Sequence, residues 1–132
     1  QKEVAQRILA KHNTNNYGRL SIVSNWRLKI INHFDVSKNC FYPKPKVNSS
    51  VVIFEPKVNR SYKIKDILNL EKVTQIFFSN RRKMINKSFK KLFGQNKNIN
   101  KVIKLNLTSR PSNLKPEDFY KMTEIYERGL KT

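Results

Sequence analysis

The chain has 132 residues, 38% of them hydrophobic, and its 28 Lys and Arg against 9 Asp and Glu give a formal charge of +19. That length suits one domain or pieces of two, and no apolar run is long enough to span a membrane. The single cysteine, Cys40, excludes an intrachain disulfide, and the two histidines have no cysteine or acidic cluster around them, so we expect no metal site. So strong a positive charge predicts an anionic partner.

The first 56 residues alternate short helices and strands. Apolar residues at helical spacing predict a helix over residues 1–11 and, after Gly18, a short buried helix that includes Trp26. Alternating apolar residues predict strands at 27–36 and 49–55, which should pair antiparallel because their connection is short. Two strands and two helices make a poor independent core, so this part is predicted to be one edge of a larger α/β sheet.

The connection between the two strands combines aromatic rings, prolines and lysines. In order they are Phe41, Tyr42, Pro43, Lys44, Pro45 and Lys46. Proline fixes its own φ and extends the residue before it, so the rings and cations should stand on a stiff backbone. Flat rings beside cations suit a stacked nucleobase whose phosphates are paired nearby. The alternative is a proline-rich turn with Phe41 in the core.

The second half of the chain has a helical pattern. The polar, basic residues 57–65 predict a linker, and helical periodicity starts at Asp66. We expect a second helix over 81–93, stopped by a glycine, a short third helix over 98–107, and a last helix over 116–129 with acids in its first turn.

A stripe of lysines runs along the helix expected at 81–93. From Lys72 to Lys115 there is no Asp or Glu, while Lys and Arg occur twelve times. Lysines 83, 87, 90 and 91 fall opposite the apolar stripe of that helix. A merely solvated face usually interleaves acids for i, i+4 pairing, so this stripe predicts a nucleic-acid surface. A solvated lysine face is the alternative.

The residue patterns of a catalytic site do not occur in the sequence. The three glycines, at 18, 94 and 129, form no phosphate or cofactor loop, and the sequence pairs no nucleophile with a histidine and an acid. On these residues alone, the chain is a basic, helix-rich RNA- or DNA-binding piece attached to a sheet edge.

Four stretches in register resemble the KsgA family of ribosomal RNA adenine dimethyltransferases. They are residues 1–7 (QKEVAQR), 17–21 (YGRLS), 41–49 and 78–83 (FSNRRK). The resemblance implies an α+β fold, in which residues 1–56 are the carboxy-terminal edge of a Rossmann-like methyltransferase sheet, 57–65 a linker and 66–132 a small all-α domain that docks on ribosomal RNA. It also implies a missing amino-terminal part that binds S-adenosylmethionine, so the isolated chain should bind no cofactor and transfer no methyl group.

The resemblance also implies residue roles and partners. Phe41 matches the ring that stacks on the flipped target adenine, and residues 42–46 match the rigid substrate loop beside it, although Lys44 replaces a proline common in bacterial members. Arg81, Arg82 and Lys83, with the carboxy-terminal helix, favour KsgA over the similar Erm family. In the KsgA family the helical domain docks on the small subunit, so we expect these three residues and the lysine stripe to bind RNA. The implied partner is the small-subunit RNA of an immature ribosomal subunit, at two adjacent adenines near its 3′ end, in the cytoplasm.

Two alternatives stay open on the sequence. An Erm-like enzyme would methylate large-subunit RNA, and a non-enzymatic basic module would only bind RNA. Since the chain starts at Gln1, we expect a fragment, whose bare apolar faces would allow dimerisation or strand swapping.

Overall fold

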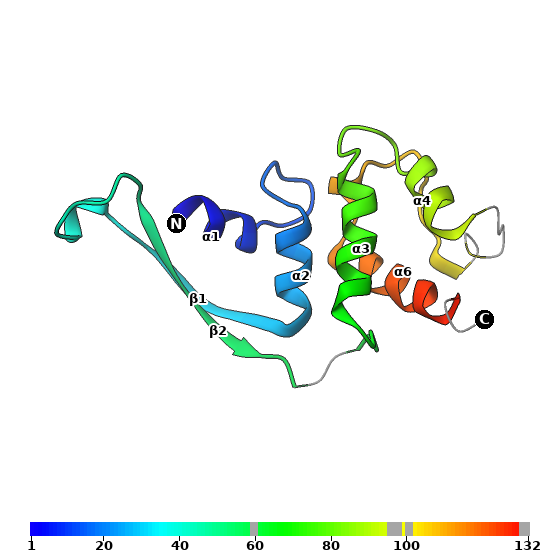
Figure 1. Cartoon of the computed structure of the whole chain (residues 1–132), viewed down its shortest axis with the longest axis horizontal. Helices are drawn as coiled ribbons and strands as arrows, with labels where there is room; N and C mark the ends of the chain where they lie inside the picture. The colour runs from blue at the N-terminus through cyan, green and yellow to red at the C-terminus, as the bar shows by residue number, and fades with distance from the viewer. Residues whose placement is uncertain (59–60, 95–98, 100–101, 130–132) are drawn as a thin grey trace.

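The computed structural model describes residues 1–58, 61–94, 99 and 102–129. A two-stranded hairpin projects from one end of a group of packed helices (Figure 1). In chain order the elements are α1 (Lys2–Leu9), α2 (Arg19–Arg27), β1 (Leu28–Val36), the 3-10 turn η1 (Lys38–Cys40), β2 (Ser49–Pro56), α3 (Ile67–Phe78), α4 (Asn86–Phe93), the 3-10 turn η2 (Pro111–Asn113) and α6 (Pro116–Gly129). In this part of the chain, no helix has the length and hydropathy needed to cross a membrane.

The strands β1 and β2 form an antiparallel pair, which confirms both predicted strands and their orientation. The register runs from Leu28 opposite Pro56 to Val36 opposite Ser49. A bulge lies between Ile30 and Asn32, where one extra residue shifts the alternation of side chains along β1.

Much of the hairpin's apolar surface is exposed to solvent. The exposed fractions are 54% for Ile31, 49% for Phe34 and 43% for Ile53. A two-stranded hairpin is marginally stable alone, because it buries little apolar surface. The hairpin therefore fits the prediction that it is part of a larger sheet.

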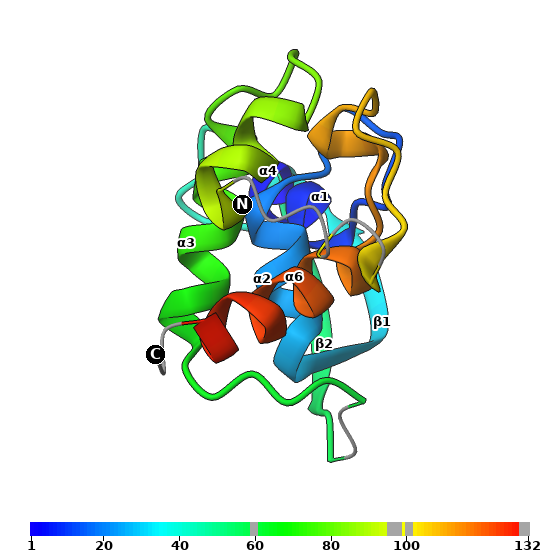
Figure 2. The ribbon, with the colours of Figure 1, turned by 90° about the vertical axis from the view of Figure 1, so that its right-hand side faces the viewer.

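Helices α2, α3 and α6 pack against one another around one hydrophobic core (Figure 2). Tyr17, just before α2, and Ile22 of α2 are fully buried together with Phe77 of α3 and Phe119 of α6. The Phe77 and Phe119 rings meet edge to face, with centroids 5.7 Å apart. The core thus draws side chains from both sides of the 57–65 connection, and the division into two domains stays a prediction.

The connection from β2 to α3 is held at both ends by hydrogen bonds. The backbone N–H of Lys57 donates to the Arg27 carbonyl oxygen at 2.8 Å. Near its other end, backbone N–H groups donate to two carboxylates of α6, Lys63 to Glu124 and Lys65 to Glu127. The described residues of this segment are therefore fixed against the helices.

The helix predicted over 81–93 is shorter than expected and begins at Asn86. The preceding residues form a turn instead, in which the Lys83 N–H donates to the Asn80 carbonyl oxygen at 3.0 Å. The Ile85 N–H donates to the distant Ser109 carbonyl oxygen at 2.8 Å rather than to a helical partner.

The remaining helix predictions have different outcomes. Of the short helix predicted over 98–107, residues 99, 102 and 103 are helical and residues 104–107 are not. Residues 98, 100 and 101 lie outside the described residues. The last helix spans 116–129 as predicted.

Candidate nucleic-acid interface

The loop at the hairpin tip, residues 37–48, presents aromatic side chains to solvent. The Phe41 ring is 46% exposed and Tyr42 is fully exposed, so the alternative that buries Phe41 in the core is wrong. The peptide bond between Tyr42 and Pro43 is cis. Lys44 and Lys46 are also exposed, so rings and cations share this tip loop as the sequence predicts.

Hydrogen bonds to backbone groups fix both ends of the tip loop. The Asn48 side-chain oxygen Oδ1 accepts from the Lys38 N–H at 3.2 Å, and the Asn48 carbonyl oxygen accepts from the Lys2 N–H at 3.1 Å. The Ser37 hydroxyl accepts from the Asn39 N–H at 3.2 Å, which caps η1. The aromatic side chains therefore stand on an anchored backbone.

A carboxylate at the end of β1 adds to this anchor. Asp35 accepts a hydrogen bond from the Ser50 hydroxyl at 2.7 Å, and its other oxygen lies 3.2 Å from the Lys2 ammonium nitrogen. The hydrogen bond from Ser50, followed by that from Lys2, lowers the pKa of Asp35. Asp35 thus stays charged at neutral pH and joins α1 to the hairpin beside the tip loop.

Exposed cations cover α4 and the turn before it, and we call Arg82, Lys83, Lys87, Lys90 and Lys91 the basic surface. All five side chains are exposed, whereas Ser88 and Phe89 of the same helix are buried. The predicted separation of apolar and basic residues on this helix is confirmed for the part that is helical. Contact of these cations with RNA stays a prediction.

Arg110 lies beside the basic surface, although no pattern in the sequence singles it out. Its Nε–H donates to the Arg82 carbonyl oxygen at 2.9 Å. The bond joins positions 28 residues apart, so only the folded chain brings the two arginines together.

Arg81 differs from its two basic neighbours because its guanidinium group binds backbone oxygens. Nη1 donates to the Tyr17 carbonyl oxygen, and Nη2 donates to those of Thr14 at 3.2 Å and Asn15 at 2.7 Å. The guanidinium carbon also lies 5.7 Å from the centre of the Phe78 ring. Arg81 therefore ties the α3–α4 turn to the loop before α2.

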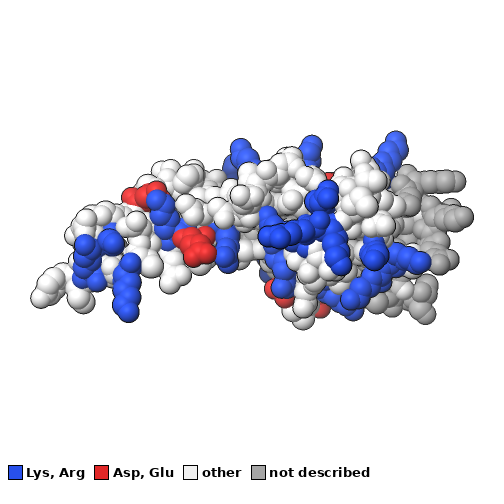
Figure 3. All heavy atoms as spheres, turned by 90° about the horizontal axis from the view of Figure 1, so that it is seen from above, with Lys and Arg blue, Asp and Glu red and all other residues white. Residues whose placement is uncertain are grey.

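The two groups of predicted site residues lie far apart. The tip loop stands at one end of the long axis, and α4 lies at the other (Figure 1). Figure 3 shows Lys and Arg side chains along one long face, gathered more densely over the helices than over the hairpin. A ligand that touched both groups at once would have to be long and anionic.

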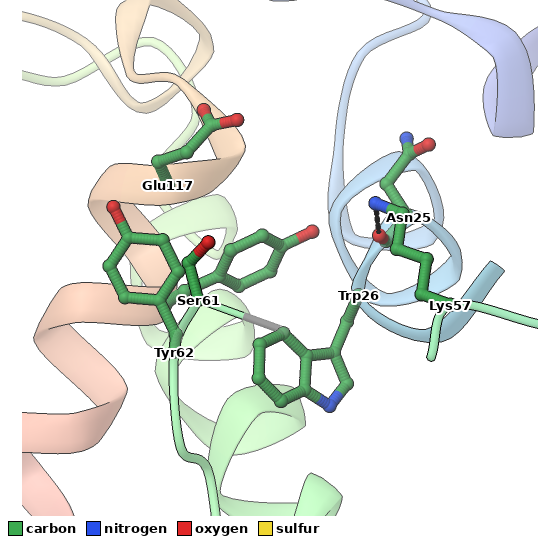
Figure 4. A pocket seen from close by; sticks show the side chains of 7 residues that line it. Asn25, Trp26, Lys57, Ser61, Tyr62 and Glu117 are labelled. Carbon is green, nitrogen blue, oxygen red and sulfur yellow. Dashed lines mark hydrogen bonds between the residues drawn. The ribbon is translucent and has the colours of Figure 1, made fainter. Parts of the chain in front are cut away.

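A hollow of about 220 Å³ lies between α2, α6 and the connection after β2 (Figure 4). The Tyr120 ring packs there against Trp26 and Tyr62, with centroids 5.1 Å and 5.9 Å away. The Lys57 ammonium group donates to the Asn25 carbonyl oxygen. We assign these side chains to packing of the connection against the helices.

Comparison with known proteins decides the family. Residues 1–128 match the family described as ribosomal RNA adenine dimethylase. The chain belongs to this family. The match confirms the family resemblance drawn from the four sequence stretches.

Members of the ribosomal RNA adenine dimethylase family are similar to the chain along nearly all of its length. "Ribosomal RNA small subunit methyltransferase A" of Pelagibacter ubique is 46% identical over 127 residues, covering 96% of this chain and 48% of that protein. The protein of the same name from a Brugia malayi Wolbachia is 36% identical, covering 90% of this chain and 45% of that protein.

A crystal structure of a dimethyladenosine transferase from Plasmodium falciparum has the same fold. It superposes with a TM-score of 0.71 and 26% identity, over 98% of this chain and 56% of that one. The α+β fold class is thereby confirmed, and the hairpin and helices are consistent with part of a Rossmann-like methyltransferase. The chain spans about half the length of the curated relatives it matches.

Among the described residues, no three His, Cys, Asp or Glu side chains are grouped so that they could hold a metal ion. The glycines at 18, 94 and 129 all lie at helix ends, and none follows a strand. A Rossmann-like cofactor site needs a glycine turn directly after a strand. The described residues therefore do not fit S-adenosylmethionine.

Proposed function

We propose that this chain is the carboxy-terminal half of an S-adenosylmethionine-dependent enzyme that dimethylates two adjacent adenines near the 3′ end of small-subunit ribosomal RNA. The match to ribosomal RNA adenine dimethylase over residues 1–128 carries the proposal. Relatives named for the small subunit favour that substrate over large-subunit RNA. Such an enzyme acts in the cytoplasm, during ribosome biogenesis.

In this proposal the tip loop receives the target base. An adenine that leaves its helix loses stacking, and the exposed Phe41 ring would replace it. The residues from Tyr42 to Lys46 would line the path of the strand, with Lys44 and Lys46 near its phosphates. The bonds of Asn48 and Asp35 would keep the ring in place before the RNA arrives.

The basic surface docks the enzyme on the small subunit in this proposal. The helix α4 lies at the other end of the molecule from the tip loop, so an RNA that touches both must be extended or folded along the whole chain. Because no described residues fit S-adenosylmethionine, the cofactor would bind in the other half of the protein. The 132-residue chain alone should therefore transfer no methyl group.

A chimera tests the proposal. The amino-terminal half of the Pelagibacter ubique relative is joined to this chain, and transfer of labelled methyl groups to unmethylated small subunits is measured. We expect transfer by the chimera and none by the 132-residue chain. Phe41→Ala should slow transfer about tenfold or more, since stacking on an aromatic ring contributes ~1–3 kcal/mol per base. Phe41→Tyr keeps the ring and should keep the rate.

Binding to small subunits is measured for each chimera, because the ring should affect methyl transfer more than overall affinity. A folded chimera that binds small subunits and transfers no methyl group would refute the proposal in favour of a non-enzymatic RNA-binding module. Transfer to protein-free large-subunit RNA instead would favour the Erm-like alternative.

A further inference from the structure

A cleft of about 470 Å³ lies where the loop before α2 meets the turn after α3. Its lining includes Arg7 of α1, Arg19 of α2 and Arg81 of the turn, with Asn15 and Asn16 of the loop between them. Figure 1 shows the loop and the turn at the same end of α2 and α3. Three arginines from separate elements thus face one small space.

The positive charge of this cleft is only partly balanced. Arg7 pairs with the Glu3 carboxylate at 2.9 Å. Within the described ranges, neither Arg19 nor Arg81 forms an ion pair with a carboxylate. The contacts of Arg81 with three carbonyl oxygens use three of its five N–H donors and leave its full positive charge in place. The cleft therefore has a net positive charge, which an anion would neutralise.

The cleft is held in shape before any ligand arrives. Three carbonyl oxygens fix the half-buried Arg81 guanidinium. Its Nη1 packs so near Gly18 that a side chain there would touch it, since a Cβ added to this glycine would lie 3.5 Å away. Gly18 starts α2, and the amides of a first helical turn carry partial positive charge. Arg19 stays exposed at the rim, where a ligand can reach it. Its Nη2 donates to the Glu71 carbonyl oxygen at a long 3.5 Å, and the guanidinium keeps further N–H donors. A fixed cationic wall with an exposed arginine at its rim suits a phosphate group.

The position of the cleft suggests the source of that phosphate. The loop and the turn that form it stand between the hairpin and α4 in Figure 1, on the face that Figure 3 shows to be densely basic over the helices. We propose that this cleft binds a phosphodiester of the RNA strand between the tip loop and the basic surface. The proposal rests on the proposed function for the identity of the RNA. It gives an RNA contact to Arg7 and Arg19, which lie in two of the four resemblance stretches and have no role assigned above.

Binding of a single-stranded oligoribonucleotide over a salt series tests the cleft. Arg19→Gln should weaken binding roughly tenfold at low salt and reduce the salt slope by about 0.7, the value for one phosphate contact on a single strand. Arg27→Gln is the matched control, because it removes the same charge from an exposed site at the other end of the same helix. Equal effects of the two variants would overturn the proposal.

A second variant adds charge without removing an arginine. Asn16→Asp places a carboxylate at the cleft and should weaken binding more than Asn32→Asp, which makes the same change on β1. In an NMR titration with inorganic phosphate, the amide signals of residues 15–19 should shift in the wild type and not in Arg19→Gln. Shifts that persist unchanged in Arg19→Gln would contradict the assignment.

These results separate the cleft from the proposed function. If lysine variants of the basic surface weaken binding but Arg19→Gln matches its control, the proposed phosphate site in the cleft is wrong and the proposed function stands. If Arg19→Gln weakens oligonucleotide binding but the chain does not distinguish small from large subunits, the cleft stands and the function fails.

Discussion

Glu127 Oε2 accepts a hydrogen bond from the Asp66 backbone N–H at 3.0 Å, which joins the last helix to the start of α3. The same carboxylate accepts from the Lys65 N–H at 2.9 Å and from the Asn69 side-chain amide at 2.8 Å. Only 7% of Glu127 is exposed. One nearly buried side chain thus holds the end of the β2–α3 connection against α6. Its negative charge lies at the amino-terminal end of α3, which favours an anion.

Replacing Glu127 by Gln should destabilise the protein. The amide group keeps one acceptor oxygen but turns its NH₂ donors toward backbone N–H donors, so at least one bond is lost. A hydrogen bond to a charged group contributes about 1.5–3 kcal/mol, and we expect a loss in that range in the free energy of unfolding by urea. Glu55→Gln, at an exposed position on β2, is the control. An equal, small loss in both variants would argue against the role of Glu127.

The same contact predicts how stability depends on pH. Burial raises the pKa of Glu127. The hydrogen bonds from the Lys65 N–H, Asn69 and the Asp66 N–H lower that pKa by more, so the net shift is downward. A lowered pKa in the folded state stabilises the protein above the unfolded value of about 4.3, and this contribution disappears as the pH falls below that value. The wild type should therefore exceed Glu127→Gln in unfolding free energy at pH 7 and lose that advantage as the pH falls through the lowered pKa of the folded state. A gap independent of pH would contradict the assignment.

Tyr17 supplies a second test of the core. Its buried hydroxyl donates to the Leu114 carbonyl oxygen at 2.7 Å, and burial raises the pKa of Tyr17, so the donor proton stays in place. Tyr17→Phe leaves that carbonyl without its bond and should cost about 1 kcal/mol of unfolding free energy. Tyr42→Phe removes the same hydroxyl from a fully exposed side chain and should have no effect. Equal stabilities of the two variants would show that the bond contributes nothing.

Local patterns in the sequence were sufficient for much of this fold. Apolar spacing predicts α1, α2, α3 and α6 because each helix buries one face, and alternation predicts both strands. The pattern fails between 81 and 85, where Ile85 has helical spacing but donates its amide hydrogen to Ser109. A partner 24 positions away decides that conformation, so periodicity within a helix could not predict it.

The candidate site shows the same limit. The tip loop could be predicted because its aromatics, prolines and lysines are consecutive. The arginine cleft could not, because Arg7, Arg19 and Arg81 come together only when three separate elements pack. In the sequence, Arg81 is one more cation of a basic motif. In the structure, its nitrogens donate hydrogen bonds to the loop before α2.

The basic surface predicts a steep salt dependence of RNA binding. Changing Lys83, Lys87 and Lys90 together to Gln should reduce the salt slope by about 2–3, since each phosphate contact contributes about 0.7–0.9. Helix content should stay unchanged, because all three side chains are exposed. A control triple, Lys29, Lys63 and Lys115 to Gln, removes the same charge from other exposed positions. The slope is measured by RNA titration at several salt concentrations, and equal slopes for both triples would count against the basic surface.

The central claim is that this chain recognises small-subunit ribosomal RNA. Its most direct test is a salt-series titration of the 132-residue chain against unmethylated small subunits, with large subunits in parallel. We predict tight, salt-steep binding to the small subunit and at least tenfold weaker binding to the large one, which corresponds to about 1.4 kcal/mol. Equal binding to both subunits would contradict the claim, because the positive charge of the chain would then act without specificity.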